Sequence, residues 1–524
     1  MRKFLMLALA TVAAVIARPS AQQRFDVILR NGSLVDGTGT GARTADVGIR
    51  SERIAAIGDL STATAATTID ARGLTVAPGF IDVHTHADEL AEHPRAEHFV
   101  RMGVTTVVAG NCGTSADDIA AALAAIQKKQ ASVNFATLVG HNTVRRAVMG
   151  TENRQATPAE LERMQALVTK AMRDGAVGFS TGLQYVPGTY APQSEILAMA
   201  RAAAREGGLY ATHMRNEGTE LEAAVQEALA VGEGAQCPVE ISHLKVDAPS
   251  RWGASAKALA LIDAARAKGM KVKADVYLYD AASSTLGIRF PSWVLEGGQA
   301  KINERLDDAA TWARIKEEMK GLIRERGLEN YDFARIASYR SDPSLNGVSI
   351  PQAAQKMLGK NDLEAQLETM RRMLHAGGAS MVYQFMSEED IGRILRHPQV
   401  AIASDSSLNV MGSGVPHPRG YGNTARALAR YVRERKVISL EDAVRKMTSL
   451  PAEHFGFADR GAIAVSKAAD IVIFDAARVA DRATYENPHQ YPAGIAHVFV
   501  NGVEVVRQGD HTGAMPGRVL RGKK

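Results

Sequence analysis

The stretch Pro-Gly-Phe-Ile-Asp-Val-His-Thr-His-Ala-Asp, residues 78–88, decides the fold. Residues 80–83 are mostly apolar and follow a Pro-Gly pair, which indicates a short buried strand after a turn. His84 and His86 stand at the end of this strand, and side chains two residues apart on a strand point to the same face. Imidazoles are ordinary zinc ligands. The stretch therefore predicts a strand whose carboxyl end presents two ligands to a divalent metal.

Seven more apolar strand patterns follow before residue 447, and helical segments separate them. The eight predicted strands span residues 80–83, 105–109, 134–139, 176–180, 209–212, 239–242, 271–277 and 400–403. Strands that alternate with helices are typical of βα units and a parallel sheet. Eight such units make a (β/α)8 barrel. The predicted fold class is therefore α/β, with a TIM-type barrel over residues 77–447.

Both ends of the chain have a different texture, with short alternating strands and turns such as Asn31-Gly32 and Asn501-Gly502. We expect one small β-sandwich domain built from residues 22–76 and 448–524. The segment 287–387, between the last two barrel strands, is much longer than one crossover connection. It is predicted to be an insertion that covers the site.

The composition excludes some classes of protein. The chain of 524 residues has a net charge of +5 and no basic run beyond residues 521–524, which gives nucleic-acid binding no support. Two basic residues precede the apolar run 4–17, and Ala17 and Ala21 are small residues suited to a cleavage site. We therefore predict a signal peptide over residues 1–21 and export to the periplasm or beyond. An uncleaved anchor is the alternative, and no later stretch is long enough to span a membrane.

The residues that follow the predicted strands are rich in metal donors. In barrels of this kind the chemistry lies at the carboxyl ends of the strands. The donors found there are His84, His86, Cys112, His141, His213, His243 and Asp405. Each alone is compatible with a packed core residue, but imidazole, thiolate and carboxylate together are the usual zinc donors. The pattern predicts a zinc site.

The two cysteines of the chain, Cys112 and Cys237, invite a disulfide in an exported protein. Cys237 precedes the sixth strand, and His243 follows it at the other end. Six extended residues span roughly 20 Å, whereas a disulfide needs Cα atoms within about 7 Å. We therefore expect Cys112 to be a free thiolate ligand.

Several stretches together resemble the amidohydrolase superfamily and, within it, the D-aminoacylase (N-acyl-D-amino-acid deacylase) family. The resemblance covers nearly the whole mature chain and is carried by Gly110-Asn111-Cys112-Gly113, Gly140-His141-Asn142, residues 212–218, 241–245 and 275–284, His417-Pro418-Arg419 and residues 451–456. It implies the barrel, the β-sandwich and hydrolysis of the amide bond of N-acyl-D-amino acids to a carboxylate and a free D-amino acid.

The resemblance also implies how zinc is held. Cys112, His213 and His243 are the expected ligands of a tight zinc site. His84, His86 and Asp405 are the expected ligands of a second, weaker site that shares Cys112. Many relatives bridge their two metals with a carboxylated lysine after the fourth strand, but residues 178–185 contain no lysine. A thiolate at Cys112 is predicted to take its place.

The chemistry assigns further roles. Asp405 is the predicted general base and acid, which takes a proton from the attacking water and passes it to the leaving nitrogen. The substrate is a small molecule with a free α-carboxylate, which needs cations and hydrogen-bond donors. The candidates for binding it are Lys245, Tyr277, Ser283 and Arg419.

Other functions are compatible with the same barrel. One is a dipeptidase for D-residue-containing peptides, and another is a cyclic amidase of the dihydropyrimidinase type. A non-catalytic binding protein on a degenerate barrel is a third. The side-chain preference, the acyl preference, the metal used in vivo and the oligomeric state are not predicted from the sequence.

Overall fold

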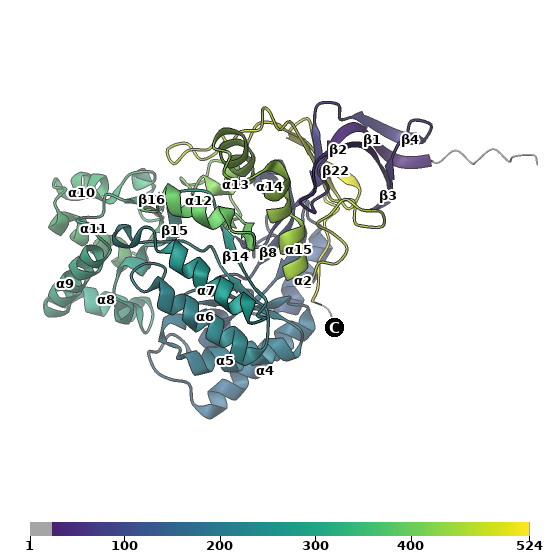
Figure 1. Cartoon of the computed structure of the whole chain (residues 1–524). Coiled ribbons are helices and arrows are strands. Elements are labelled where there is room, and N and C mark those ends of the chain that lie inside the picture. Colours follow the sequence, from purple (N-terminus) through teal and green to yellow (C-terminus); the bar gives the residue numbers. More distant parts are fainter. Residues whose placement is uncertain (1–23, 523–524) are drawn as a thin grey trace, which may run out of the picture.

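The computed structural model describes residues 24–522. The predicted signal peptide, residues 1–21, lies outside these residues. Within the described part of the chain, no helix combines the length and the apolar composition needed to cross a bilayer. Figure 1 shows an α/β body with a β-rich part, formed by both chain ends, on one side. A helical part formed by residues 299–375 lies on the opposite side.

Eight parallel strands form a closed barrel at the positions predicted from the sequence. They are β6 (Phe80–Asp82), β8 (Val104–Ala109), β9 (Asn134–Thr137) continued by β10 (Val139–Gly140), β11 (Gly178–Gly182), β12 (Leu209–His213), β13 (Val239–Ile241), β14 (Val272–Val276) and β18 (Val400–Ile402). They pair in chain order, from β6 to β9 and from β10 to β14 and β18. The ring closes where β19 (Ser406–Ser407) pairs in parallel with β7 (Thr85–His86). The predicted fold class is confirmed.

Helices surround the barrel. They are α1 (Glu97–Arg101), α2 (Ile119–Lys129), α3 (His141–Met149), α4 (Pro158–Asp174), α5 (Gln193–Arg205), α6 (Leu221–Ala235), α7 (Ser255–Ala267), α12 (Glu388–Arg396), α13 (Arg419–Arg426), α14 (Leu440–Lys446) and α15 (Ser449–His454). In α2, α4, α12 and α14 a side chain at the N-cap accepts a backbone N–H of the first turn. In α4, Thr157 and Glu160 form a reciprocal capping box, and the helix ends at Gly175. Its buried residues Met164 and Val168 stand four apart, which is the spacing of one helix face.

The insertion carries helices and a small sheet of its own. Its elements are α8 (Gln299–Asp307), α9 (Ala309–Glu325), β16 (Ala334–Ser338), α10 (Ile350–Leu358), α11 (Leu363–His375) and β17 (Ser380–Gln384). β17 pairs in antiparallel fashion with β16 on one side and with β15 (Ala281–Thr285) on the other. The small sheet therefore begins before residue 287. β15 could not be predicted from the sequence, because Ala-Ala-Ser-Ser-Thr contains no apolar run.

Both chain ends build one nine-stranded sheet. Its strands are β1 (Arg24–Leu34), β2 (Arg43–Arg50), β3 (Arg53–Gly58), β4 (Thr64–Asp70), β5 (Thr75–Pro78), β20 (Ile471–Phe474), β21 (Ile495–Val500), β22 (Val503–Arg507) and β23 (Asp510–His511). β5 pairs with β20 and so joins the two halves. The buried side chains of Leu29, Val47, Ile471 and Phe499 share one core. The edge strand β3 reaches the segment before β20 through an antiparallel bridge between Arg53 and Ala468, so the sheet folds over itself.

The two Asn-Gly pairs have different conformations. Asn501 and Gly502, with φ of 48° and 79°, form the predicted tight turn between β21 and β22. The turn predicted at Asn31 and Gly32 is wrong, because β1 continues through both residues with a shift in register. The N–H of Asn31 donates to Asp46 Oδ1 over 2.9 Å, which gives the displaced backbone group a partner. Asn31-Gly32 is therefore a β-bulge.

Candidate metal centre and substrate cavity

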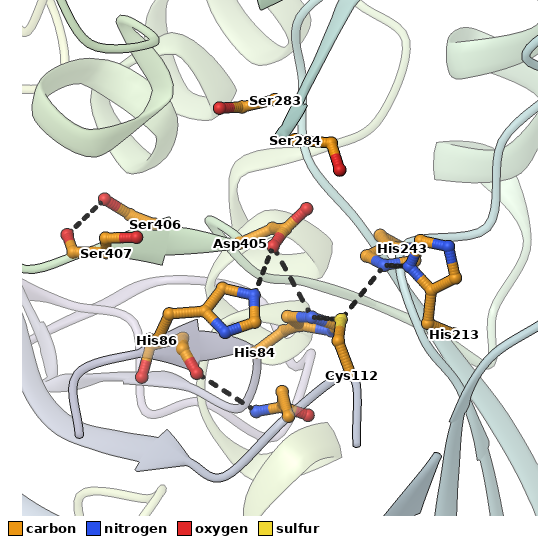
Figure 2. A network of polar contacts seen from close by, with 12 residues as sticks. His84, His86, Cys112, His213, His243, Ser283, Ser284, Asp405, Ser406 and Ser407 are labelled. Atoms are coloured by element: carbon orange, nitrogen blue, oxygen red, sulfur yellow. Dashed lines mark hydrogen bonds and ion pairs between the residues drawn. The ribbon is translucent and has the colours of Figure 1, made fainter. Parts of the chain in front are cut away.

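Six predicted ligands come together at the carboxyl ends of the barrel strands (Figure 2). They form two groups, of which one contains His84, His86, Cys112 and Asp405 and the other contains Cys112, His213 and His243. Within each group the ligand atoms all lie within 4.8 Å of one another. Because Cys112 belongs to both groups, the arrangement offers two metal positions that share one sulfur.

Three of these ligands stand on strained backbone. Cys112, His243 and Asp405 have φ of 53°, 34° and 52°, in the left-handed region that residues other than glycine rarely adopt. Each lies just beyond the end of a barrel strand. Such strain persists only where the surrounding structure enforces it, and it gathers at functional sites. Gly182 makes room for this backbone, since a Cβ there would lie 2.0 Å from the Cys112 carbonyl oxygen.

The spacing of the ligand atoms fits zinc. Tetrahedral zinc with bonds of about 2.0–2.3 Å places its ligand atoms roughly 3.3–3.8 Å apart. The Cys112 sulfur lies 3.3 Å from Nε2 of His84 and 3.5 Å from Nε2 of His243. Oδ1 of Asp405 lies 3.5 Å from Nε2 of His84 and 3.2 Å from Nε2 of His86. The shortest separation, 2.9 Å, joins Nδ1 of His213 to Nε2 of His243.

The electrostatics favour a thiolate at Cys112. Burial by itself would raise the pKa of this thiol, but His84 and His243 hold it well below the usual value. Both cysteines are free, which confirms that no disulfide joins them. Burial raises the pKa of Cys237 to about 11, so that thiol stays protonated. A thiolate with imidazole and carboxylate partners is a donor set suited to zinc.

A buried carboxylate stands behind the histidines of the second group. Oε1 of Glu217 lies 3.0 Å from Nδ1 of His243, and Oε2 lies 3.6 Å from Nε2 of His213. Burial would raise the pKa of Glu217, but His213, Lys245 and His243 lower it well below its usual value. The carboxylate is thus within hydrogen-bond distance of the His243 ring, which it can orient, and it lies close to the His213 ring. Lys245 donates to Glu217 over 2.7 Å, so its charge is already paired where it lines the substrate cavity.

Asp405 is paired with a cation on the side away from the histidines. Nη1 of Arg419 lies 2.8 Å from its Oδ2, and the guanidinium lies 4.5 Å from the centre of the Tyr277 ring. Burial alone would raise the pKa of Asp405. Arg419, followed by His84 and His243, nevertheless holds that pKa well below its usual value. The carboxylate is therefore ionised at neutral pH and able to accept a proton.

A cavity of about 550 Å³ opens over the ligand groups. The four residues predicted to bind the substrate carboxylate, Lys245, Tyr277, Ser283 and Arg419, all line it. The insertion forms one wall, because β15, β17 and the segment after each contribute lining residues. Figure 2 shows Ser283 and Ser284 on the side of Asp405 away from Cys112.

His141 does not join the other donors. It begins α3, and its Nε2 lies 2.9 Å from Oε1 of Glu195, which also pairs with Arg145. The ring is fully buried against the helices and belongs to neither ligand group. Its inclusion among the predicted donors is wrong. The residue follows the third strand as expected, but the chain turns there directly into a helix.

Two cavity residues escaped the sequence reasoning. The hydroxyl of Tyr185 lies 3.5 Å from Nδ1 of His213 and accepts a hydrogen bond from Ser284. Arg289 belongs to the insertion and lies among the rings of Tyr383, Phe385 and Phe333. Tyr185 follows β11, but a tyrosine is not a usual zinc donor, and Arg289 lies in the insertion rather than after a barrel strand.

Known proteins share both the sequence and the fold. The chain matches the model of the amidohydrolase family over residues 67–506. It is 40% identical to N-acyl-D-glutamate deacylase and 38% identical to D-aminoacylase, both from Alcaligenes xylosoxydans xylosoxydans. These comparisons cover 95% of this chain with 97% of the first relative, and 96% of this chain with 98% of the second.

A solved structure extends the comparison to three dimensions. The crystal structure of N-acyl-D-glutamate deacylase from Bordetella bronchiseptica, complexed with zinc and a phosphonate inhibitor, is 37% identical with a TM-score of 0.83. The superposition covers 95% of this chain and 100% of that one. The family model and the relatives thus point to the same class of protein as the barrel and its ligand groups. The chain belongs to the amidohydrolase family, in the group of the D-aminoacylases.

Proposed function

We propose that this chain is a zinc-dependent deacylase of N-acyl-D-amino acids and that it prefers an acidic D side chain. Two ligand groups that share the Cys112 sulfur carry the first part of the proposal. Relatives named for the deacylation of N-acyl-D-amino acids, one of them crystallised with zinc, support the metal and the substrate class.

The chain's own residues supply the rest of the chemistry. The two ligand groups would hold zinc, which when bound would polarise the amide carbonyl and lower the pKa of a water molecule. Asp405, kept ionised and oriented by Arg419, accepts a proton from the attacking water and delivers it to the leaving nitrogen. The Tyr185 hydroxyl faces the same space and donates to the oxygen on which charge develops. Arg419 and Tyr277 lie where the α-carboxylate would bind.

Arg289 carries the proposed preference for an acidic side chain. It is 8% exposed, it lines the cavity, and its Nε has no hydrogen-bond partner. Among residues 24–522 no carboxylate pairs with it, since Asp247 is already bound by Arg326. A buried cation without a counter-ion is costly unless a ligand supplies one. A carboxylate on the D side chain, as in N-acyl-D-glutamate, is such a ligand.

Two other functions compete with the deacylase. A cyclic amidase of the dihydropyrimidinase type usually relies on a carboxylated lysine, and β11 with the residues after it contains none. A dipeptidase for D-residue-containing peptides is the second candidate. A further cavity of about 300 Å³ adjoins Ser283, Asp405 and Arg419 and leaves room for an aminoacyl group in place of a simple acyl group.

The substrate preference is tested with isosteric substrates. We expect kcat/KM for N-acetyl-D-glutamate to exceed that for N-acetyl-D-glutamine by about 10- to 100-fold, the value of one charge-assisted contact. Arg289→Met should abolish this difference. Arg146→Met is the matched control, because Arg146 also lines the cavity but is exposed, and it should keep the difference. Equal rates on the two substrates in the parent enzyme would contradict the preference, and no hydrolysis of any N-acyl-D-amino acid would contradict the activity.

We also propose that residues 1–21 direct export and are removed. The basic start, the apolar run and the small residues near position 21 support this. Intact mass of protein recovered from the periplasm tests the proposal. A full-length mass, recovered from the cytoplasm, would contradict it.

A further inference from the structure

One buried carboxylate contacts ligands of both metal groups. Asp275 lies in β14 and is 1% exposed. Its Oδ2 lies 3.3 Å from Nδ1 of His84, and its Oδ1 accepts the backbone N–H of His243 over 2.9 Å. His84 and His243 belong to different ligand groups, and both face the shared sulfur of Cys112.

The contact with His84 fixes the state of its ring. Nε2 of His84 faces Cys112 and Asp405, so this nitrogen is the one that binds metal. A neutral imidazole that binds through Nε2 carries its proton on Nδ1. Asp275 accepts that proton in a hydrogen bond, which selects the binding tautomer and holds the plane of the ring.

The contact with His243 acts on the backbone. His243 has φ of 34°, and a strained residue of this kind needs fixed partners to hold its conformation. The bond from its N–H to Asp275 is such a partner. One carboxylate thus holds the ring of a ligand in one group and the main chain of a ligand in the other.

A second buried acid, on the neighbouring strand β13, contacts Asp275. Glu240, in β13, is 3% exposed and forms a side-chain hydrogen bond with Asp275. Its Oε1 meets no donor in the described part of the chain, and its Oε2 lies 3.1 Å from Nε2 of His454. Burial, followed by the Asp275 charge, raises the pKa of Glu240 well above its usual value. Two ionised carboxylates cannot form a hydrogen bond with each other, so in this contact Glu240 would be the donor and Asp275 the acceptor.

From these contacts we infer that Asp275 is a positioning residue that locks the two ligand groups together and that Glu240 keeps the Asp275 carboxylate in place. The inference rests on the proposed zinc function. It predicts that loss of the Asp275 carboxylate weakens the group that contains His84 most, because that group loses its selected tautomer. The group of His213 and His243 keeps Glu217 behind its rings and should hold its zinc.

Zinc binding by Asp275→Asn tests the inference without reference to activity. The amide oxygen can still accept the N–H of His243, but the amide NH₂ then faces Nδ1 of His84. If Nδ1 accepts a hydrogen bond from it, the ring proton must lie on Nε2, and Nε2 can no longer bind metal. We expect the zinc in the group that contains His84 to bind about 10- to 100-fold more weakly, which is the usual effect of losing such a partner. The affinity of the other zinc should not change. Asp82→Asn is the matched control, because Asp82 is a buried carboxylate in β6 that accepts the backbone N–H groups of His84 and Ser404, and an amide oxygen accepts both equally well. It should keep both affinities.

Three further measurements separate positioning from simple stabilisation. With cobalt in place of zinc, the absorption of the Cys112 thiolate complex should persist in Asp275→Asn. If Asp275 had only a structural role, Asp275→Asn would lower the melting temperature of the metal-free protein but leave both zinc affinities at the parental values. That result would overturn the inference. If Asp275→Asn is not recovered folded, Glu240→Leu replaces it. Parental zinc affinities in Glu240→Leu would likewise overturn the inference, whereas a weaker second zinc supports it.

Discussion

Nη1 of Arg419 lies 2.8 Å from Oδ2 of Asp405, and the other oxygen of this carboxylate faces His84 and His86. Asp405 follows β18 and Arg419 begins α13, so one loop carries both residues. The carboxylate thus contacts the metal ligands with one oxygen and the cation of the substrate cavity with the other. A substrate bound against Arg419 would therefore lie next to Asp405, the proposed general base and acid.

Asp405→Asn should lower turnover by at least ~10²-fold, the lower end of what a positioned acid–base group supplies. The zinc held by Cys112, His213 and His243 should remain, because none of these ligands is changed. KM should change far less than kcat, since most contacts to the α-carboxylate are untouched. Zinc analysis and steady-state kinetics of the purified variant check both expectations. Normal turnover would make Asp405 a structural residue, and loss of both zinc ions would make it mainly a ligand.

Cys112→Ala should lose most of the zinc and nearly all turnover, because both ligand groups contain this sulfur. Cys237→Ala is the matched control, since Cys237 is the other free thiol and belongs to neither group. It should keep parental zinc and rate. Metal analysis of the two variants decides the matter. Parental zinc in Cys112→Ala would remove the bridging thiolate from the site.

Tyr185→Phe should reduce kcat by about 10²-fold if its hydroxyl donates to the developing oxyanion. The variant removes a single hydroxyl and leaves the ring, which packs beside His213 with centroids 4.7 Å apart. Zinc content should therefore stay parental. Ser284→Ala, which removes only the donor to Tyr185, should have a smaller effect on the rate. Parental kcat in Tyr185→Phe would exclude the role.

Much of the fold and of the ligand set could be predicted because the determining pattern is local. Eight short apolar runs mark the barrel strands, and donors such as Cys112 and His243 stand directly after them. The same rule failed at His141, where an early helix turns the ring toward Glu195. The prediction of a turn from the Asn31-Gly32 pair failed for a similar reason. A distant acceptor in β2, Asp46, stabilises a bulge there instead.

Residues whose role depends on distant partners could not be predicted. Arg289 lines the cavity only because the insertion folds back over the barrel. Asp275 lies within the predicted strand 271–277, and nothing beside it in the sequence shows that its partners are residues 84 and 243. The paired state of Lys245 depends on Glu217, 28 positions away. Only the folded chain reveals such relationships.

Stability should fall as the pH is lowered below neutrality, and His98 contributes to this. The ring is buried, donates through Nδ1 to the Gly420 carbonyl, and accepts the N–H of Asn409 at Nε2. Burial lowers its pKa to about 4, whereas the unfolded value is about 6.5. Between these two pH values the unfolded chain binds a proton that the native chain does not. The free energy of unfolding therefore decreases as the pH is lowered from about 6.5 to about 4.

Replacing His98 by Gln tests this account, because an amide side chain can donate and accept but does not titrate. Denaturant unfolding between pH 7 and 4.5 should give a shallower loss of stability for His98→Gln than for the parent. Zinc and the other titrating groups are common to both proteins, so the difference isolates His98. Parallel stability curves would show that His98 does not contribute.

The most direct test of the central claim is a zinc titration of the metal-free enzyme, followed by hydrolysis of N-acetyl-D-glutamate with N-acetyl-L-glutamate as the control. The account predicts no turnover without metal, activity that returns as zinc fills the groups sharing Cys112, and no hydrolysis of the L enantiomer. Full activity in the metal-free enzyme, or equal rates on both enantiomers, would contradict it.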